Sequence, residues 1–90
     1  MARDEIIEQL RRARDDGQSA VAIAELLGRL DPRGLTDATV IFGFKVAFPE
    51  IPLQTIQDAC QWHRVSRGRL TDDEFNEMLS AWLGPARRES

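Results

Sequence analysis

The 90-residue chain contains only one cysteine, one histidine and one lysine, and these shortages exclude several classes of protein. A single cysteine cannot form a disulfide within the chain, which favours a reducing compartment such as the cytoplasm. Cys60 and His63 supply only two of the four ligands that a structural zinc site requires. We therefore expect a cytoplasmic protein with no metal and no other cofactor.

Long apolar runs are absent as well. The first stretch, MARDEIIEQLRRARDD, is charged throughout and has neither the apolar segment of a signal peptide nor a membrane span. The net charge of −3 does not suit a dedicated nucleic-acid binder, which usually has a basic excess on one face. Eleven arginines accompany the single lysine, a bias that we associate with a bacterial gene of high GC content.

Amphipathic patterns occupy most of the chain. Apolar residues recur at spacings of three and four in residues 2–16, 19–30 and 71–83, which predicts a helix in each stretch. Ser19 is the expected N-cap of the second helix, and Thr71 with Glu74 forms a capping box at the start of the last.

A further helix is expected from Pro52 to Val65 or Ser66. Proline is favourable in the first turn of a helix. The apolar residues of the segment share one side of the helix with Cys60 and His63. We expect this helix and the 71–83 helix to form a C-terminal αα-hairpin.

Residues 37–48 fit two kinds of secondary structure. As a strand the segment alternates well, and Gly43 costs a helix about 1 kcal/mol. As a helix it is apolar nearly all round, apart from Lys45 and one threonine. The sequence contains no second strand candidate, and a lone strand leaves its backbone groups unpaired. We therefore predict a helix, with an N-cap at Thr36 or Asp37.

Together the patterns predict an all-α fold: a compact bundle of about five short helices in one domain, residues 1–84, with a loose tail at 85–90. The apolar helix at 37–48 is expected at its centre, and Phe75, Leu79 and Trp82 in its core. If the other helices leave part of the central helix exposed, that area marks an interface with a second copy or with another protein.

Cys60 and His63 lie three residues apart on one predicted helical face. One hypothesis is a thiolate–imidazole dyad or half of a metal site. The other, which we favour, is a small buried thiol beside a hydrogen-bonded core histidine. No carboxylate pair and no glycine-rich phosphate loop stands out in the sequence, so we do not expect an enzyme.

The turn at residues 63–69, where the predicted 52–66 helix ends, carries Arg64, Arg67 and Arg69, which are candidates for binding a phosphate or an acidic partner surface. The alternative role of these arginines is to decorate the C-terminus of that helix. Two further residues complete the set of candidate partner-binding residues: Lys45, which interrupts the apolar 37–48 segment, and Trp62, at the edge of the apolar stripe of the 52–66 helix.

Two functions remain open. The first is a non-enzymatic protein-interaction module of the adaptor or immunity-inhibitor type, which binds another protein or forms a homodimer. The alternative is a helix-turn-helix DNA-binding regulator, because Ala24 and Gly28 have the spacing found in that motif. A recognition helix should present polar or basic side chains to base edges, whereas residues 37–48 are mostly apolar, so nucleic acid is the less favoured partner.

Ala47-Phe48-Pro49, Ile56 and Met78-Leu79 resemble the Phe-Pro and di-leucine marks of the CUE family. The resemblance covers less than half of the chain and implies a three-helix domain that binds ubiquitin. Ala47 stands in place of the usual methionine and Met78 in place of the first leucine. Since the arginine bias indicates a bacterial gene, we do not assign the chain to this family.

Overall fold

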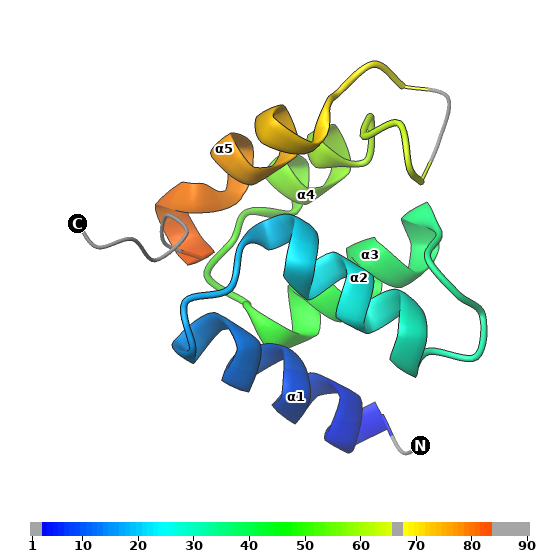
Figure 1. The fold of residues 1–90 in the computed structure, drawn as a ribbon, viewed down its shortest axis with the longest axis vertical. Coiled ribbons are helices and arrows are strands. Elements are labelled where there is room, and N and C mark those ends of the chain that lie inside the picture. The colour runs from blue at the N-terminus through cyan, green and yellow to red at the C-terminus, as the bar shows by residue number, and fades with distance from the viewer. Residues whose placement is uncertain (1–2, 66–67, 84–90) are drawn as a thin grey trace.

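The structure, a computed structural model, describes residues 3–65 and 68–83, which form five helices (Figure 1). These helices are α1 (Arg3–Asp15), α2 (Ala20–Leu30), α3 (Asp37–Ala47), α4 (Leu53–Ala59) and α5 (Asp72–Leu83). Within these two ranges the only β-type pairing is an isolated bridge between Trp62 and Leu70. The predicted all-α bundle and the helix predicted at 37–48 are therefore confirmed. The predicted tail at 85–90 lies outside the described residues.

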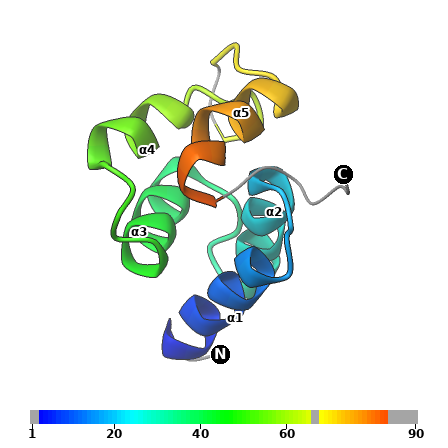
Figure 2. The ribbon, with the colours of Figure 1, turned by 90° about the vertical axis from the view of Figure 1, so that its left-hand side faces the viewer.

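The helices are stacked in three layers (Figures 1 and 2). α1 forms one end, α2 and α3 lie side by side in the middle, and α4 and α5 form the other end. α2 contacts α1, α3 and α5, while α3 contacts α1 and α4. The middle layer therefore separates α1 from the α4–α5 pair.

Local signals in the sequence determine where the helices begin. The Ser19 hydroxyl accepts a hydrogen bond of 3.1 Å from the backbone N–H three residues later, at the start of α2. Thr36 and Thr39 form a capping box at the start of α3. Thr71 and Glu74 form the predicted one at the start of α5, with hydrogen bonds of 2.9 and 3.2 Å. Each cap satisfies backbone N–H groups that have no partner within the helix.

Aromatic side chains form the centre of the core. Phe44, Phe48, Trp62 and Phe75 are fully buried. The Trp62 and Phe75 rings stack with their centroids 4.0 Å apart. The Phe44 ring meets Phe48 and Phe75 edge-on, at 5.7 and 6.4 Å. This cluster joins the middle layer to the α4–α5 end of the molecule.

The predicted apolar stripes are largely buried. On α5, Phe75 and Leu79 are buried as predicted, whereas Trp82 is only partly buried. On α1, the four buried residues follow the apolar spacing that predicted the helix at 2–16: Ile6, Ile7, Leu10 and Ala13. Helical periodicity therefore identified the inward faces of both helices.

α4 is shorter than predicted. It ends at Ala59 instead of continuing to residue 65 or 66, and the next residues make tight turns with bonds to carbonyls three residues back. Because the chain leaves the helix here, Trp62 enters the core and stacks on Phe75. Burial of this large ring offsets the loss of helical hydrogen bonds.

Candidate functional site

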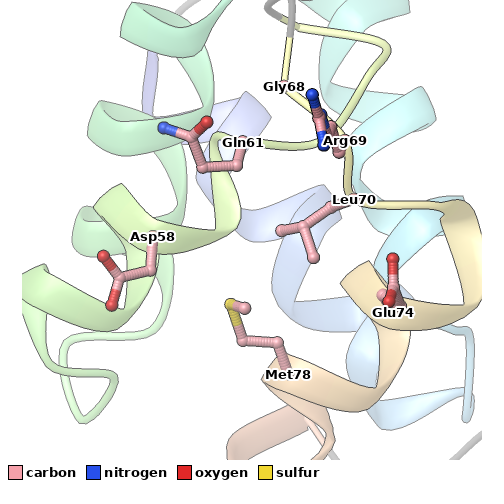
Figure 3. Close-up of a pocket in the computed structure, with 7 residues that line it drawn as sticks. All are labelled: Asp58, Gln61, Gly68, Arg69, Leu70, Glu74 and Met78. Atoms are coloured by element: carbon pink, nitrogen blue, oxygen red, sulfur yellow. The ribbon is translucent and has the colours of Figure 1, made fainter.

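A hollow of about 670 Å³ opens between α4 and α5 (Figure 3). The side chains of Leu70 and Met78 extend into this space and form an apolar floor. Polar side chains form the rim. The complete lining is Asp58, Gln61, Gly68, Arg69, Leu70, Glu74 and Met78.

The hollow depends on the path of the segment between the two helices. The Leu70 N–H donates to the Gln61 carbonyl at 3.1 Å, and the His63 N–H donates to the Leu70 carbonyl at 3.1 Å. Gly68 approaches Gln61 so closely that a Cβ at position 68 would overlap the Gln61 carbonyl. Glycine at position 68 therefore permits the pairing that places Leu70 in the floor.

Charges of both signs lie around the hollow. Asp58 on α4 accepts a hydrogen bond of 2.9 Å from the Gln54 side-chain amide. On α5, Glu74 accepts the capping bond described above, and Arg69 contributes an exposed cation from the connecting segment. An apolar floor with a rim of mixed charge matches a partner segment that has an apolar side chain flanked by polar groups.

A second polar cluster attaches the connecting segment to α5 through Asp72. The Trp62 indole N–H donates to Asp72 Oδ1 at 2.7 Å, and His63 Nε2 lies 3.3 Å from the same oxygen. Arg64 Nη1 pairs with Glu25 at 2.7 Å and lies 3.7 Å from Asp72 Oδ2. Three consecutive residues thus converge on one carboxylate, which fixes the segment beside the hollow.

We expect Asp72 to make the stability of the protein sensitive to acid. The hydrogen bond from Trp62 is the largest cause that lowers the pKa of Asp72, with His63 and Arg64 adding to it and partial desolvation opposing it. The pKa is lower in the folded chain than in the unfolded chain. The stabilisation is therefore present above the ordinary value of 3.8 and is lost as the pH falls through the folded-state value.

Urea midpoints measured from about pH 6 to about pH 3 test this expectation. The midpoint should fall with pH, and it should fall less in Asp72→Asn, which keeps an acceptor for Trp62 but carries no charge. Some pH dependence should remain, because hydrogen bonds from Arg33 also lower the pKa of Asp31. Parallel profiles for the two proteins would contradict the assignment.

The predicted partner-binding residues are dispersed in the structure. Trp62 is fully buried, so its assignment to a contact surface is wrong; the ring turns inward where α4 ends. The Arg64 guanidinium lies 5.1 Å from the Trp62 ring centroid and is paired with Glu25. The Lys45 ammonium donates to two backbone carbonyls of the α3–α4 connection, at 2.9 and 3.1 Å. Two of the predicted cations therefore have structural partners.

Arg69 is the predicted residue that lies at the hollow, and Arg67 is outside the described residues. The apolar floor, and both acidic residues of the rim, were not predicted from the sequence. Asp58 and Glu74 look like ordinary helix-surface residues in the sequence. Met78 follows the apolar spacing of α5, and it is partly buried. Only the three-dimensional path of the connecting segment brings these side chains together.

Cys60 and His63 lie in different environments. Cys60 is buried, with Sγ 3.9 Å from the Asp37 carbonyl. Burial, with a contribution from Asp37, raises the pKa of its thiol to about 11, so the thiol stays protonated at neutral pH and is a poor nucleophile. The His63 side chain is 54% exposed beside Asp72, so the prediction that His63 lies in the core is wrong. The physical reason is that α4 ends at Ala59, before this residue.

The residues that suggested a helix-turn-helix have packing roles. Ala24 is fully buried, and a Cβ at Gly28 would lie 2.9 Å from Leu35 Cβ, so Gly28 allows the α2–α3 connection to pack closely. The helix that would enter a DNA groove, α3, exposes the apolar side chains Phe42 and Val46. This surface does not favour hydrogen bonds to base edges.

Comparison of the chain with protein-family models, with curated proteins and with solved structures gave no match. The resemblance to the CUE family therefore has no support from a family model. Phe48 and Leu79, which carry part of that resemblance, are fully buried here, and helix packing accounts for them.

Residues 3–65 and 68–83 contain no cluster of three or more histidine, cysteine or acidic side chains arranged to hold a metal ion. No helix within these ranges has the length and apolar character needed to cross a bilayer.

Proposed function

We propose that this chain is a small non-enzymatic protein-interaction module that holds a segment of a partner protein in the hollow between α4 and α5. The hollow itself is the observation that supports the proposal, because Leu70 and Met78 offer an apolar floor inside a charged rim. An adaptor and an inhibitor of the immunity type would both act in this way. A bacterial origin and a cytoplasmic location, inferred from the arginine bias and the single cysteine, belong to the same proposal.

The chemistry of the rim favours binding over catalysis. Its polar side chains are exposed, whereas catalytic acids and bases usually lie in surroundings from which water is largely excluded. The Asp58 and Glu74 carboxylates already accept hydrogen bonds from groups of the chain itself. The thiol of Cys60 is buried and protonated. These features support a recognition surface.

The floor should supply most of the binding energy. Interfaces derive most of their affinity from a few apolar anchors in pockets, with a polar rim that excludes water. Burial of an apolar partner side chain against Leu70 and Met78 should contribute about 1.5–3 kcal/mol. Arg69, Asp58 and Glu74 would select the charges on either side of that anchor.

Site-directed photo-crosslinking tests the proposal. A photoreactive benzophenone residue is placed at Gln61 on the rim or, as a matched control, at Glu77, an exposed residue of α5 that does not line the hollow. After illumination in cells of the source organism, we expect a discrete adduct of one partner from Gln61 and none from Glu77. No adduct, or the same adducts from both positions, would contradict the assignment to the hollow.

Two substitutions examine the floor and the rim separately. Met78→Ala should lower the yield of the Gln61 adduct about tenfold, since it removes part of the apolar anchor site. Arg69→Glu should reduce the yield and also reverse its dependence on salt if the partner segment is acidic next to Arg69. Urea midpoints near that of the wild type confirm that each variant is folded. Unchanged adduct yields in both variants would show that the partner binds elsewhere.

A further inference from the structure

The groove between α1 and α3 exposes apolar surface on a different side of the molecule from the hollow. Phe42 and Val46 lie one turn apart on α3 and are 40% and 39% exposed. Among the described residues, the only other large apolar side chain that is similarly exposed is Leu53 on α4, at 45%. A contiguous exposed apolar patch marks a site of interaction with another molecule when it is large enough, and Phe42 and Val46 would form its centre on this face.

α1 forms the opposite wall of this groove. Two adjoining hollows, of about 180 and 680 Å³, lie along it, and Ile7 lines both. The Arg3 guanidinium lies 4.7 Å from the centroid of the Phe42 ring, and the Arg11 side chain donates to the Ala47 carbonyl at 3.0 Å. Arg3 and Arg11 therefore cover the two ends of the groove. Between them Ile7 is buried, at 7% exposure, whereas Val46 keeps 39% of its surface exposed.

The charges of α1 along this groove are unevenly distributed. Asp4 and Glu8 lie in its N-terminal half and Arg11 and Arg12 in its C-terminal half, an order that suits the helix dipole, with Arg3 and Asp15 of the opposite sign at the two ends. Glu8 and Arg12 also form an exposed ion pair within the helix, at 3.4 Å. In a second copy that runs in the opposite direction, Asp4 and Glu8 would face the half that carries Arg11 and Arg12, and Arg3 would face the end that carries Asp15.

We propose that a second copy of this chain covers the α1–α3 groove, with the two α1 helices antiparallel across a two-fold axis. In such an isologous contact, every pairing occurs twice, so the charge complementarity of Asp4 and Glu8 with Arg11 and Arg12 is doubled. Phe42 and Val46 of both copies supply the apolar centre. α4 and α5, which contribute residues to the hollow, lie on the far side of the middle layer from α1 (Figures 1 and 2), so the hollow stays open in the dimer.

Sedimentation equilibrium of the full chain at micromolar to millimolar concentration tests the proposal. The mass should rise with concentration from 10.2 kDa toward twice that value. Val46→Lys should raise the dimer dissociation constant about tenfold or more, while Leu53→Lys, a matched change at an exposed site on α4, should leave it unchanged. Circular dichroism and urea midpoints establish that both variants are folded.

A charge-exchange experiment tests the antiparallel arrangement. Asp4→Lys/Glu8→Lys and Arg12→Glu should each weaken self-association, because each variant presents like charges to its own copy. An equimolar mixture of the two should form a heterodimer at least tenfold tighter than either homodimer. Arg11 is retained because it holds α3.

A mass of 10.2 kDa at all concentrations would overturn the proposal, as would a dimer indifferent to Val46→Lys. A mixture that associates no better than its components would also overturn it. These outcomes are independent of the crosslink from Gln61, so failure here leaves the proposed role of the hollow intact.

Discussion

Replacement of Leu79 by alanine should lower the free energy of unfolding by about 2–5 kcal/mol. Leu79 is fully buried on α5, which packs against α2 and α4. The substitution removes the transfer free energy of the lost methyl and methylene groups and leaves a cavity among rigid neighbours. Small domains have total stabilities of only about 5–15 kcal/mol, so this loss is a large share.

Leu53→Ala is the matched control, because the chemical change is identical and the Leu53 side chain is 45% exposed. Its cost should be under about 1 kcal/mol. Urea unfolding followed by tryptophan fluorescence measures both variants, with the slope checked so that a change in midpoint reports stability. A loss below about 1 kcal/mol for Leu79→Ala, or equal losses for the two variants, would mean that the inner face of α5 is not part of the core.

Gly68→Ala should destabilise the protein by about 1–3 kcal/mol, although Gly68 lies outside every helix. A Cβ at this position would overlap the Gln61 carbonyl, which is backbone and cannot rotate away. The segment would have to separate from Gln61, at the expense of the Leu70 N–H bond and of the fixed position of Trp62. The floor of the hollow would be disturbed at the same time.

Arg69→Ala is the control for this prediction, since it alters the neighbouring exposed residue and should change the stability by no more than about 0.5 kcal/mol. Amide hydrogen exchange at Leu70 gives a local measurement. Its protection should fall sharply in Gly68→Ala and stay near the wild-type value in Arg69→Ala. Preserved protection in Gly68→Ala would show that the close approach to Gln61 is not required.

Local patterns predicted most of the helices. α1, α2, α3 and α5 begin and end within about one residue of their predicted limits wherever those limits are described. Ser19, Thr36 and Thr71 cap the helices that follow them, because a side-chain oxygen satisfies backbone donors within the next three residues. Such contacts are close in sequence and depend little on the rest of the fold.

The end of α4 could not be predicted in the same way. The helical pattern continues through Trp62 and His63, and nothing within a few residues interrupts it. The helix ends because the Trp62 ring stacks on Phe75 and its N–H reaches Asp72, contacts that join residues ten or more apart. Two wrong predictions follow from this one helix end: that His63 lies in the core and that Trp62 lies on the surface.

The sequence by itself determined an all-α chain, the inward faces of its longest helices and the caps that start them, because helical periodicity and capping act over a few residues. Only the tertiary structure decided which surfaces remain open. The neighbouring helices bury most of the apolar surface of α3 but leave Phe42 and Val46 accessible. Leu70 and Met78 line the same hollow only because the connecting segment folds back on Gln61. Such surfaces arise between residues far apart in the chain, where no local pattern records which side chains will meet.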